Sequence, residues 1–145
     1  MYSNIRRAVS CDIPQLIEVW EESVRSTHDF LSENEIYFYK ERIPCYLKEV
    51  EIYVYTDCNS HIKGFIGVVA ENIEMLFVNK RGKGIGTMLL NFALEKLNAA
   101  TVDVNEENNA AVGFYLSKEF SIVGRSGKDN EGKEHPIIHL KLKSK

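Results

Sequence analysis

Residues 81–87 bring together side chains and backbone that could bind a phosphate group. They read Arg-Gly-Lys-Gly-Ile-Gly-Thr, with glycine at three alternate positions, the cation Arg81 before the first glycine and the cation Lys83 between the first two. Glycine lets the backbone approach a ligand closely. The residues that follow keep helical spacing, so the loop opens a helix, whose N-terminal N–H groups and positive dipole end suit an anion. The pattern therefore predicts a cradle for a pyrophosphate.

Other glycine-rich motifs fit this loop less well. The P-loop pattern requires a Lys-Ser or Lys-Thr pair after the last glycine, and none follows Gly86. The dinucleotide-binding fingerprint is GxGxxG, whereas the spacing here is GxGxG. Taken alone, the loop could also be a glycine-rich turn that binds no ligand.

Several segments of the chain resemble the GNAT acetyltransferase family. Arg81-x-x-Gly84-x-Gly86 resembles the R/Q-x-x-G-x-G/A signature with which that family holds the pyrophosphate of CoA. Residues 108–115, Asn-Asn-Ala-Ala-Val-Gly-Phe-Tyr, look like the family's fourth-helix segment. Two further segments are similar to a subgroup of small bacterial GNAT proteins, namely residues 27–31 and the tail Gly124-Arg125-Ser126 with Asp129, Gly132 and Pro136. The resemblance covers nearly the whole chain.

The resemblance implies that acetyl-CoA is the co-substrate and that no metal takes part. In the family, backbone groups at the end of the fourth strand hold the pantetheine arm and the thioester, and the glycine loop holds the pyrophosphate. Asn108 corresponds to a residue that often contacts CoA, although it could equally cap the helix that follows. The expected cofactor-binding residues are Leu76, Phe77, Val78, Arg81, Gly82, Lys83, Gly84, Ile85, Gly86, Thr87 and Asn108.

Acetyl transfer to an amine needs an acid for the leaving thiolate and a base for the ammonium group. The resemblance makes Tyr115 the candidate acid, because a phenol is protonated at neutral pH; the alternative is a packed aromatic ring. Strand alternation predicts that Glu74 shares a face with Leu76 and Val78, near the thioester, so Glu74 is the candidate base. Glu71 is the weaker candidate, and a solvated carboxylate remains the alternative for both.

The acceptor is expected to be a primary amine of a small molecule, a peptide N-terminus or a lysine. His28 and Phe30 follow the first helix, where the family builds its substrate side, and are the candidate substrate-binding residues; a structural role for His28 stays open. The resemblance implies direct attack by the amine within a ternary complex. The alternative function is a non-catalytic module that binds or senses acyl-CoA, which would keep the loop but lack a usable acid.

Two positions depart from the family's pattern. The segment between Val78 and Arg81 is about two residues shorter than usual, which could alter the entrance to the loop. Glu119 stands before Phe120 where the family usually has a glycine. That glycine would end the fourth helix as a C-cap, so its absence should weaken the helix end without affecting the chemistry.

Hydrophobic periodicity and turn signals predict the elements that position these residues. Asp12 is expected to cap the first helix, and Ser32 with Glu35 to form a capping box for the second, which Pro44 should kink or end. Strands are predicted at residues 4–9, 51–56, 63–70, 73–78, 101–105, 120–125 and 136–142, and helices from residue 13, from residue 32, from residue 85 and at 108–118. This order predicts a mixed α/β chain with the GNAT acyl-CoA N-acyltransferase fold, a twisted and mostly antiparallel sheet of about seven strands with about four helices.

Length and composition limit the class of protein. The 145 residues suit one domain, 1–145, and the net charge of −3 argues against a nucleic-acid partner. No run approaches the roughly 20 apolar residues of a membrane span, so a cytoplasmic protein without a membrane partner is expected. Three separated cysteines and four histidines show no metal-binding spacing. A homodimer is left open.

Overall fold

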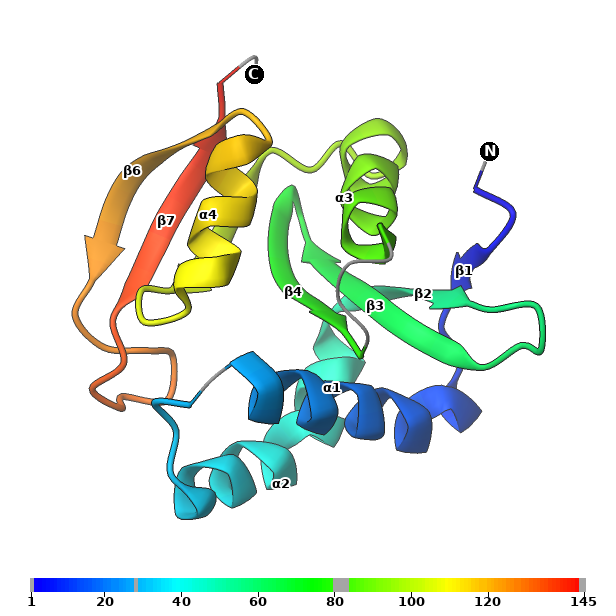
Figure 1. Ribbon diagram of the computed structural model, residues 1–145, viewed down its shortest axis with the longest axis horizontal. Helices are drawn as coiled ribbons and strands as arrows, with labels where there is room; N and C mark the ends of the chain where they lie inside the picture. The colour runs from blue at the N-terminus through cyan, green and yellow to red at the C-terminus, as the bar shows by residue number, and fades with distance from the viewer. Residues whose placement is uncertain (1, 28, 80–83, 144–145) are drawn as a thin grey trace. The chain divides into compact units, whose positions relative to one another are not determined.

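The computed structural model describes residues 2–27, 29–79 and 84–143. These residues form seven strands, four α-helices and one short 3-10 helix (Figure 1). In chain order they are β1 (Ile5–Arg7), the 3-10 helix (Ser10–Asp12), α1 (Ile13–Thr27), α2 (Glu33–Glu49), β2 (Glu51–Thr56), β3 (Ile62–Val69), β4 (Asn72–Val78), α3 (Ile85–Lys96), β5 (Thr101–Asn105), α4 (Asn109–Ser117), β6 (Phe120–Ser126) and β7 (Ile137–Leu142). The predicted mixed α/β class is confirmed. The chain divides into two compact units, residues 1–99 and 100–145.

The first unit is a sheet of β1 to β4 with helices on both faces (Figure 1). The strands pair in chain order and are antiparallel, which confirms the predicted meander. Phe65 of β3 is fully buried among side chains of α1 and α2. Its neighbour Gly64 faces α3, because a Cβ added there would lie 3.1 Å from Ile85 Cγ2 and 3.3 Å from Leu89 Cδ1. Glycine at this position therefore lets the first turn of α3 lie close to the sheet.

The capping box predicted for α2 is present. The Glu35 backbone N–H donates to Ser32 Oγ at 3.2 Å, and the Ser32 N–H donates to Glu35 Oε1 at 3.2 Å. Pro44 does not end the helix, which runs through it to Glu49. Proline removes one hydrogen bond from the helix interior, and burial of Ile43 and Leu47 on either side of Pro44 supports continuation of the helix.

Asp12 has a different role from the one predicted for it, which was to act as the N-cap of α1. It ends the 3-10 helix and is buried, and its carboxylate accepts two hydrogen bonds from Arg6 at 2.8 and 3.0 Å. It also accepts from the Val9 N–H at 2.8 Å. The Arg6 hydrogen bond, with help from Val9, lowers the pKa of Asp12. This carboxylate therefore joins β1 to the turn before α1.

The second unit contains β5, β7 and β6 in that spatial order, paired antiparallel, with α4 against β5 and β6. Its buried side chains include Val102, Leu140, Tyr115 and Phe120. Glu119, which replaces the family's usual glycine, has a φ of 72°. Glu119 therefore has the left-handed conformation that is expected of the glycine it replaces.

None of the helices in the described ranges is long and apolar enough to span a membrane.

Candidate active site

The N-terminus of α3 has features of an anion-binding site. Gly84 is its N-cap, with φ 76° and ψ 5°, and none of the described side chains caps the helix there. A Cβ added to Gly84 would meet no atom of the described residues within 4 Å. The first hydrogen bond of the helix runs from the Met88 N–H to the Gly84 carbonyl at 3.0 Å, and the N–H groups before it have no partner within the helix. A glycine in the left-handed conformation and N–H groups without a partner in the helix are what a pyrophosphate site requires.

The remaining described residues of the loop differ in the groups that they can present to a ligand. The Ile85 side chain is buried against Gly64, so only its backbone is available to a ligand. Gly86 and Thr87 are half-buried on the first turn. The predicted contributions of Arg81, Gly82 and Lys83 lie outside the described residues.

The end of β4 combines core side chains with candidate binding backbone. Leu76, Phe77 and Val78 pair with Ile66, Phe65 and Gly64 of β3, and the Phe77 ring lies 5.7 Å from that of Phe65. Asn79 follows directly, and its buried Oδ1 has no hydrogen-bond partner among the described residues. Sequence reasoning missed this asparagine, although a polar residue directly after an apolar strand is a signal for a candidate binding residue.

A β-bulge in β4 leaves Glu74 without a partner on β3. Gly67 pairs with Met75 but Val68 pairs with Ile73, so Glu74 is the extra residue of β4. Paired residues of antiparallel strands share a face, and a bulge leaves its extra residue unpaired. The bulge therefore moves Ile73 to the face of Leu76 and Val78. Because Glu74 is unpaired, the register does not assign its face, and the prediction that it shares the face of Leu76 and Val78 stays a prediction.

The Glu74 carboxylate has a defined partner. The Asn72 side-chain amide donates to its Oε2. Asn72 pairs with Val69 and so lies on the same face as Met75. Glu71 is exposed and accepts from the Asn98 amide at 2.8 Å. Both carboxylates are thus held by asparagine side chains, and only Glu74 belongs to the strand.

In the second unit, the two residues predicted from the motif lie at the N-cap and in the last turn of α4. Asn108 is the N-cap, and its Oδ1 accepts from the Ala111 N–H at 3.2 Å. Tyr115 is 4% exposed, and its ring contacts Phe114 and Phe120 edge-on at 5.2 and 5.5 Å. Burial raises the pKa of the Tyr115 phenol. The hydroxyl is therefore protonated at neutral pH and can donate a hydrogen bond.

Comparison with known proteins identifies the family. Residues 16–138 match the family described as an acetyltransferase (GNAT) domain. The chain belongs to the GNAT acetyltransferase family. It is 37% identical to the peptidyl-lysine N-acetyltransferase YjaB of Salmonella typhimurium over 97% of this chain and 98% of that protein, and 33% identical to YjaB of Escherichia coli over 97% of each. The solution structure of the apo form of E. coli YjaB matches with a TM-score of 0.89 over 96% of both chains, at 33% identity.

These comparisons confirm the family, the fold and the enzyme class that the motifs predicted. This GNAT acetyltransferase has a seven-stranded, four-helix architecture in the residues described, as its fold relatives do. Among the described residues there is no cluster of three or more His, Cys, Asp or Glu side chains able to hold a metal ion. The predicted substrate residue His28 lies outside the described ranges, and Phe30 lies half-buried in the turn between α1 and α2.

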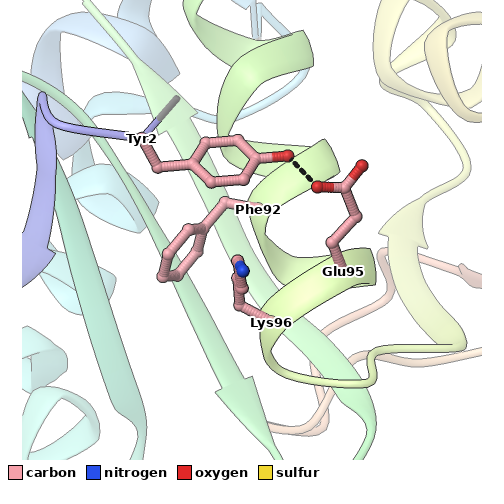
Figure 2. A pocket seen from close by; sticks show the side chains of 4 residues that line it. All are labelled: Tyr2, Phe92, Glu95 and Lys96. Carbon is pink, nitrogen blue, oxygen red and sulfur yellow. Dashed lines mark hydrogen bonds between the residues drawn. The ribbon is translucent and has the colours of Figure 1, made fainter.

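A shallow pocket at the other end of α3 is separate from the glycine loop. It has a volume of about 530 Å³ and is lined by Tyr2, Phe92, Glu95 and Lys96 (Figure 2). The Tyr2 hydroxyl donates to Glu95, which raises the pKa of that phenol. Glu95 stands ten residues after Ile85, which corresponds to about 15 Å along a helix. The pocket in this GNAT acetyltransferase therefore does not belong to the candidate pyrophosphate site.

Proposed function

We propose that this chain transfers the acetyl group of acetyl-CoA to the ε-amino group of a lysine in a peptide or protein. The observation that carries the donor half is the open N-terminus of α3, entered through Gly84 in the left-handed conformation. The full-length relatives named peptidyl-lysine N-acetyltransferases support the acceptor half. A small amine or a peptide N-terminus would be the acceptor if lysine peptides fail.

The first unit would supply binding and proton removal. Backbone N–H groups of Ile85, Gly86 and Thr87 would hold the pyrophosphate, with Arg81, Gly82 and Lys83 completing the loop. The backbone of residues 76–78 would hold the pantetheine arm and the thioester. Acetyl-CoA, when bound, supplies the activated acetyl group. Glu74 would accept the ammonium proton, directly or through water, with Asn72 orienting its carboxylate.

The second unit would supply the acid. Tyr115 would give its proton, or a strong hydrogen bond, to the leaving thiolate. The raised pKa favours the protonated hydroxyl before reaction but also makes full proton transfer less favourable. Donation to the sulfur as its negative charge develops is therefore the expected role. Asn108 would hold the start of α4 while its amide N–H groups remain available to CoA.

The test is a peptide assay with acetyl-CoA and release of free thiol as the readout. One peptide carries a free lysine and a blocked N-terminus, and a matched peptide carries a blocked lysine and a free N-terminus. Thiol release and an acetyl group on the lysine of the first peptide alone are expected. Acetylation of only the second peptide would contradict the lysine assignment. Binding of acetyl-CoA without turnover across an amine panel would favour the sensing module.

The base assignment predicts a change in pH dependence. Glu74→Gln keeps the size of the side chain and removes its ability to take a proton. We expect a lower kcat/KM and loss or displacement of the acidic limb of its pH profile, while affinity for acetyl-CoA hardly changes. Glu71→Gln is the matched control on the neighbouring turn. A Glu74→Gln profile that overlays the wild type would move the role to Glu71, to His28 or to water.

A further inference from the structure

Three polar side chains of the second unit form a hydrogen-bonded chain that the acetyltransferase assignment does not use. Ser126 Oγ lies 2.8 Å from His139 Nε2, and His139 Nδ1 lies 2.6 Å from Asp103 Oδ1. A carboxylate accepts hydrogen bonds only, so the proton of a neutral imidazole resides on Nδ1. Nε2 then presents its lone pair to the Ser126 hydroxyl. This is the order of groups that activates a serine nucleophile.

The register of three neighbouring strands produces this chain. Asp103 of β5 stands directly opposite His139 of β7, and Gly124 of β6 stands opposite His139 on its other side. Ser126 comes two residues after Gly124 and so shares its face. A Cβ on Gly124 would lie 3.5 Å from His139 Cδ2, so the imidazole lies over this glycine and reaches Ser126.

The chain lies on the accessible face of these strands. Val102, Val104 and Leu140 are buried, so alternation places Asp103 and His139 on the opposite face. Both of these side chains are 36% exposed, and Ser126 is exposed. Gly127 follows, and a Cβ added there would meet no atom within 4 Å in the part of the chain that the structure describes. A small reagent can therefore approach the Ser126 hydroxyl from solvent.

We propose that Ser126 is a nucleophile that accepts acyl groups from activated esters and thioesters. Ser126 Oγ forms a bond to the carbonyl carbon, and His139 Nε2 takes the hydroxyl proton. The bond from that carbon to the thiolate or phenolate breaks, and the leaving group receives the proton from His139. The product is an ester on Ser126, which water hydrolyses to a carboxylic acid and free Ser126. Asp103 is a positioning residue that holds the imidazole.

This activity is independent of amine acetylation, since it uses neither Tyr115 nor the glycine loop. It gives a role to the Gly124-Arg125-Ser126 segment, which the proposed amine acetylation leaves unused. Arg125 stands between the two with its guanidinium held by the Glu106 carboxylate at 2.6 and 3.0 Å. That ion pair keeps the Arg125 side chain with Glu106, while its neighbours Gly124 and Ser126 line the His139 side of the strand.

The experiment treats the full chain with p-nitrophenyl acetate and, separately, with acetyl-CoA in the absence of an amine. Peptide mapping by mass spectrometry is expected to find one acetyl group on Ser126. Ser126→Ala abolishes that label, and His139→Gln slows labelling at least ~10²-fold, the lower range for loss of a general base. Asp103→Asn slows labelling and changes its pH dependence, because an amide can turn its NH₂ toward Nδ1 and favour the wrong tautomer.

Controls separate this site from the proposed amine transfer and from simple loss of fold. Ser121→Ala, on the same strand but opposite Lys141, should leave the label unchanged. Ser126→Ala should keep amine acetylation, and Tyr115→Phe should keep labelling by p-nitrophenyl acetate. Thermal unfolding of each variant checks that the fold is intact. No acetyl group on Ser126 from either donor, or equal labelling in folded His139→Gln, would overturn the proposal.

Discussion

The starts of α3 and α4 handle the same physical problem in opposite ways. Every helix begins with N–H groups that have no partner inside it. At α4 the Asn108 side chain accepts from one of them, the Ala111 N–H, at 3.2 Å. At α3 the N-cap is Gly84, which has no side chain to accept and holds a φ of 76°. One helix therefore satisfies one of its first N–H groups with its own N-cap side chain, whereas the other has no such side chain at its N-cap, which suits a ligand.

Because of this difference, the start of α4 favours stability of the fold, whereas the start of α3 favours binding of an anion. An N-cap such as Asn108 contributes about 1 kcal/mol to folding. A helix start without a cap gives up that stabilisation and gains an anion site. The α4 helix carries its candidate chemistry at the far end, where Tyr115 is buried between two aromatic rings. The two helices thus place function at opposite ends, and substitutions at each end should have different effects.

The largest effect is expected at the functional end of α4. Tyr115→Phe keeps the ring and its contacts with Phe114 and Phe120 but removes the hydroxyl. Loss of a general acid typically lowers the rate about 10²–10⁴-fold, and we expect kcat to fall toward that range while acetyl-CoA binding is nearly unchanged. Steady-state kinetics with the best amine acceptor measure this. Turnover at the wild-type rate would show that another group protonates the thiolate.

The next largest effect is expected at the open start of α3. Gly86→Asp places a carboxylate among the free N–H groups, which suits the helix but repels a pyrophosphate. Loss of charge-assisted hydrogen bonds at about 1.5–3 kcal/mol each should weaken acetyl-CoA binding by ~100-fold or more. Calorimetry gives the affinity. Gly127→Asp makes the same change in an exposed bend and should leave affinity unchanged; unchanged affinity in Gly86→Asp would remove the loop from the site.

A smaller effect is expected at the capped start of α4. Asn108→Ala removes the acceptor for the Ala111 N–H and should lower the free energy of unfolding by about 1 kcal/mol. This corresponds to a fall in Tm of roughly 2–4 °C for a chain of this size. Asn109→Ala, at the exposed next position, is the control. A rise in KM for acetyl-CoA beyond the loss of stability would show that Asn108 also contacts CoA.

The smallest effect is expected where the two helices end. Asn98 after α3 and Glu119 after α4 both have positive φ, at 57° and 72°. Glutamate is strained there, so Glu119→Gly should raise the free energy of unfolding by about 0.5–1 kcal/mol. Asn98→Gly should give no gain, because asparagine tolerates this conformation and its amide donates to Glu71. Chemical denaturation compares the two; equal changes would mean that Glu119 is not strained.

Local sequence predicted most of the elements because their signals act over a few residues. The capping box of Ser32 and Glu35 is present as predicted, and β2 and β5 have the predicted bounds. The family motif placed Asn108 near the start and Tyr115 near the end of α4, and they lie at its N-cap and in its last turn. Pro44 shows the limit of such signals, since the packing of Ile43 and Leu47 supports continuation of the helix despite the lost hydrogen bond.

By itself the sequence determined the family, the order of the elements and the glycine that begins α3, because motifs and periodicity depend only on the order and spacing of residues along the chain. Only the tertiary structure decided which face each side chain takes. The face of Ile73 depends on a bulge at Glu74, which is a property of how β4 pairs with β3. The chain of Ser126, His139 and Asp103 likewise depends on the register of three strands. Both arise from pairing between residues distant in sequence, which no local pattern records.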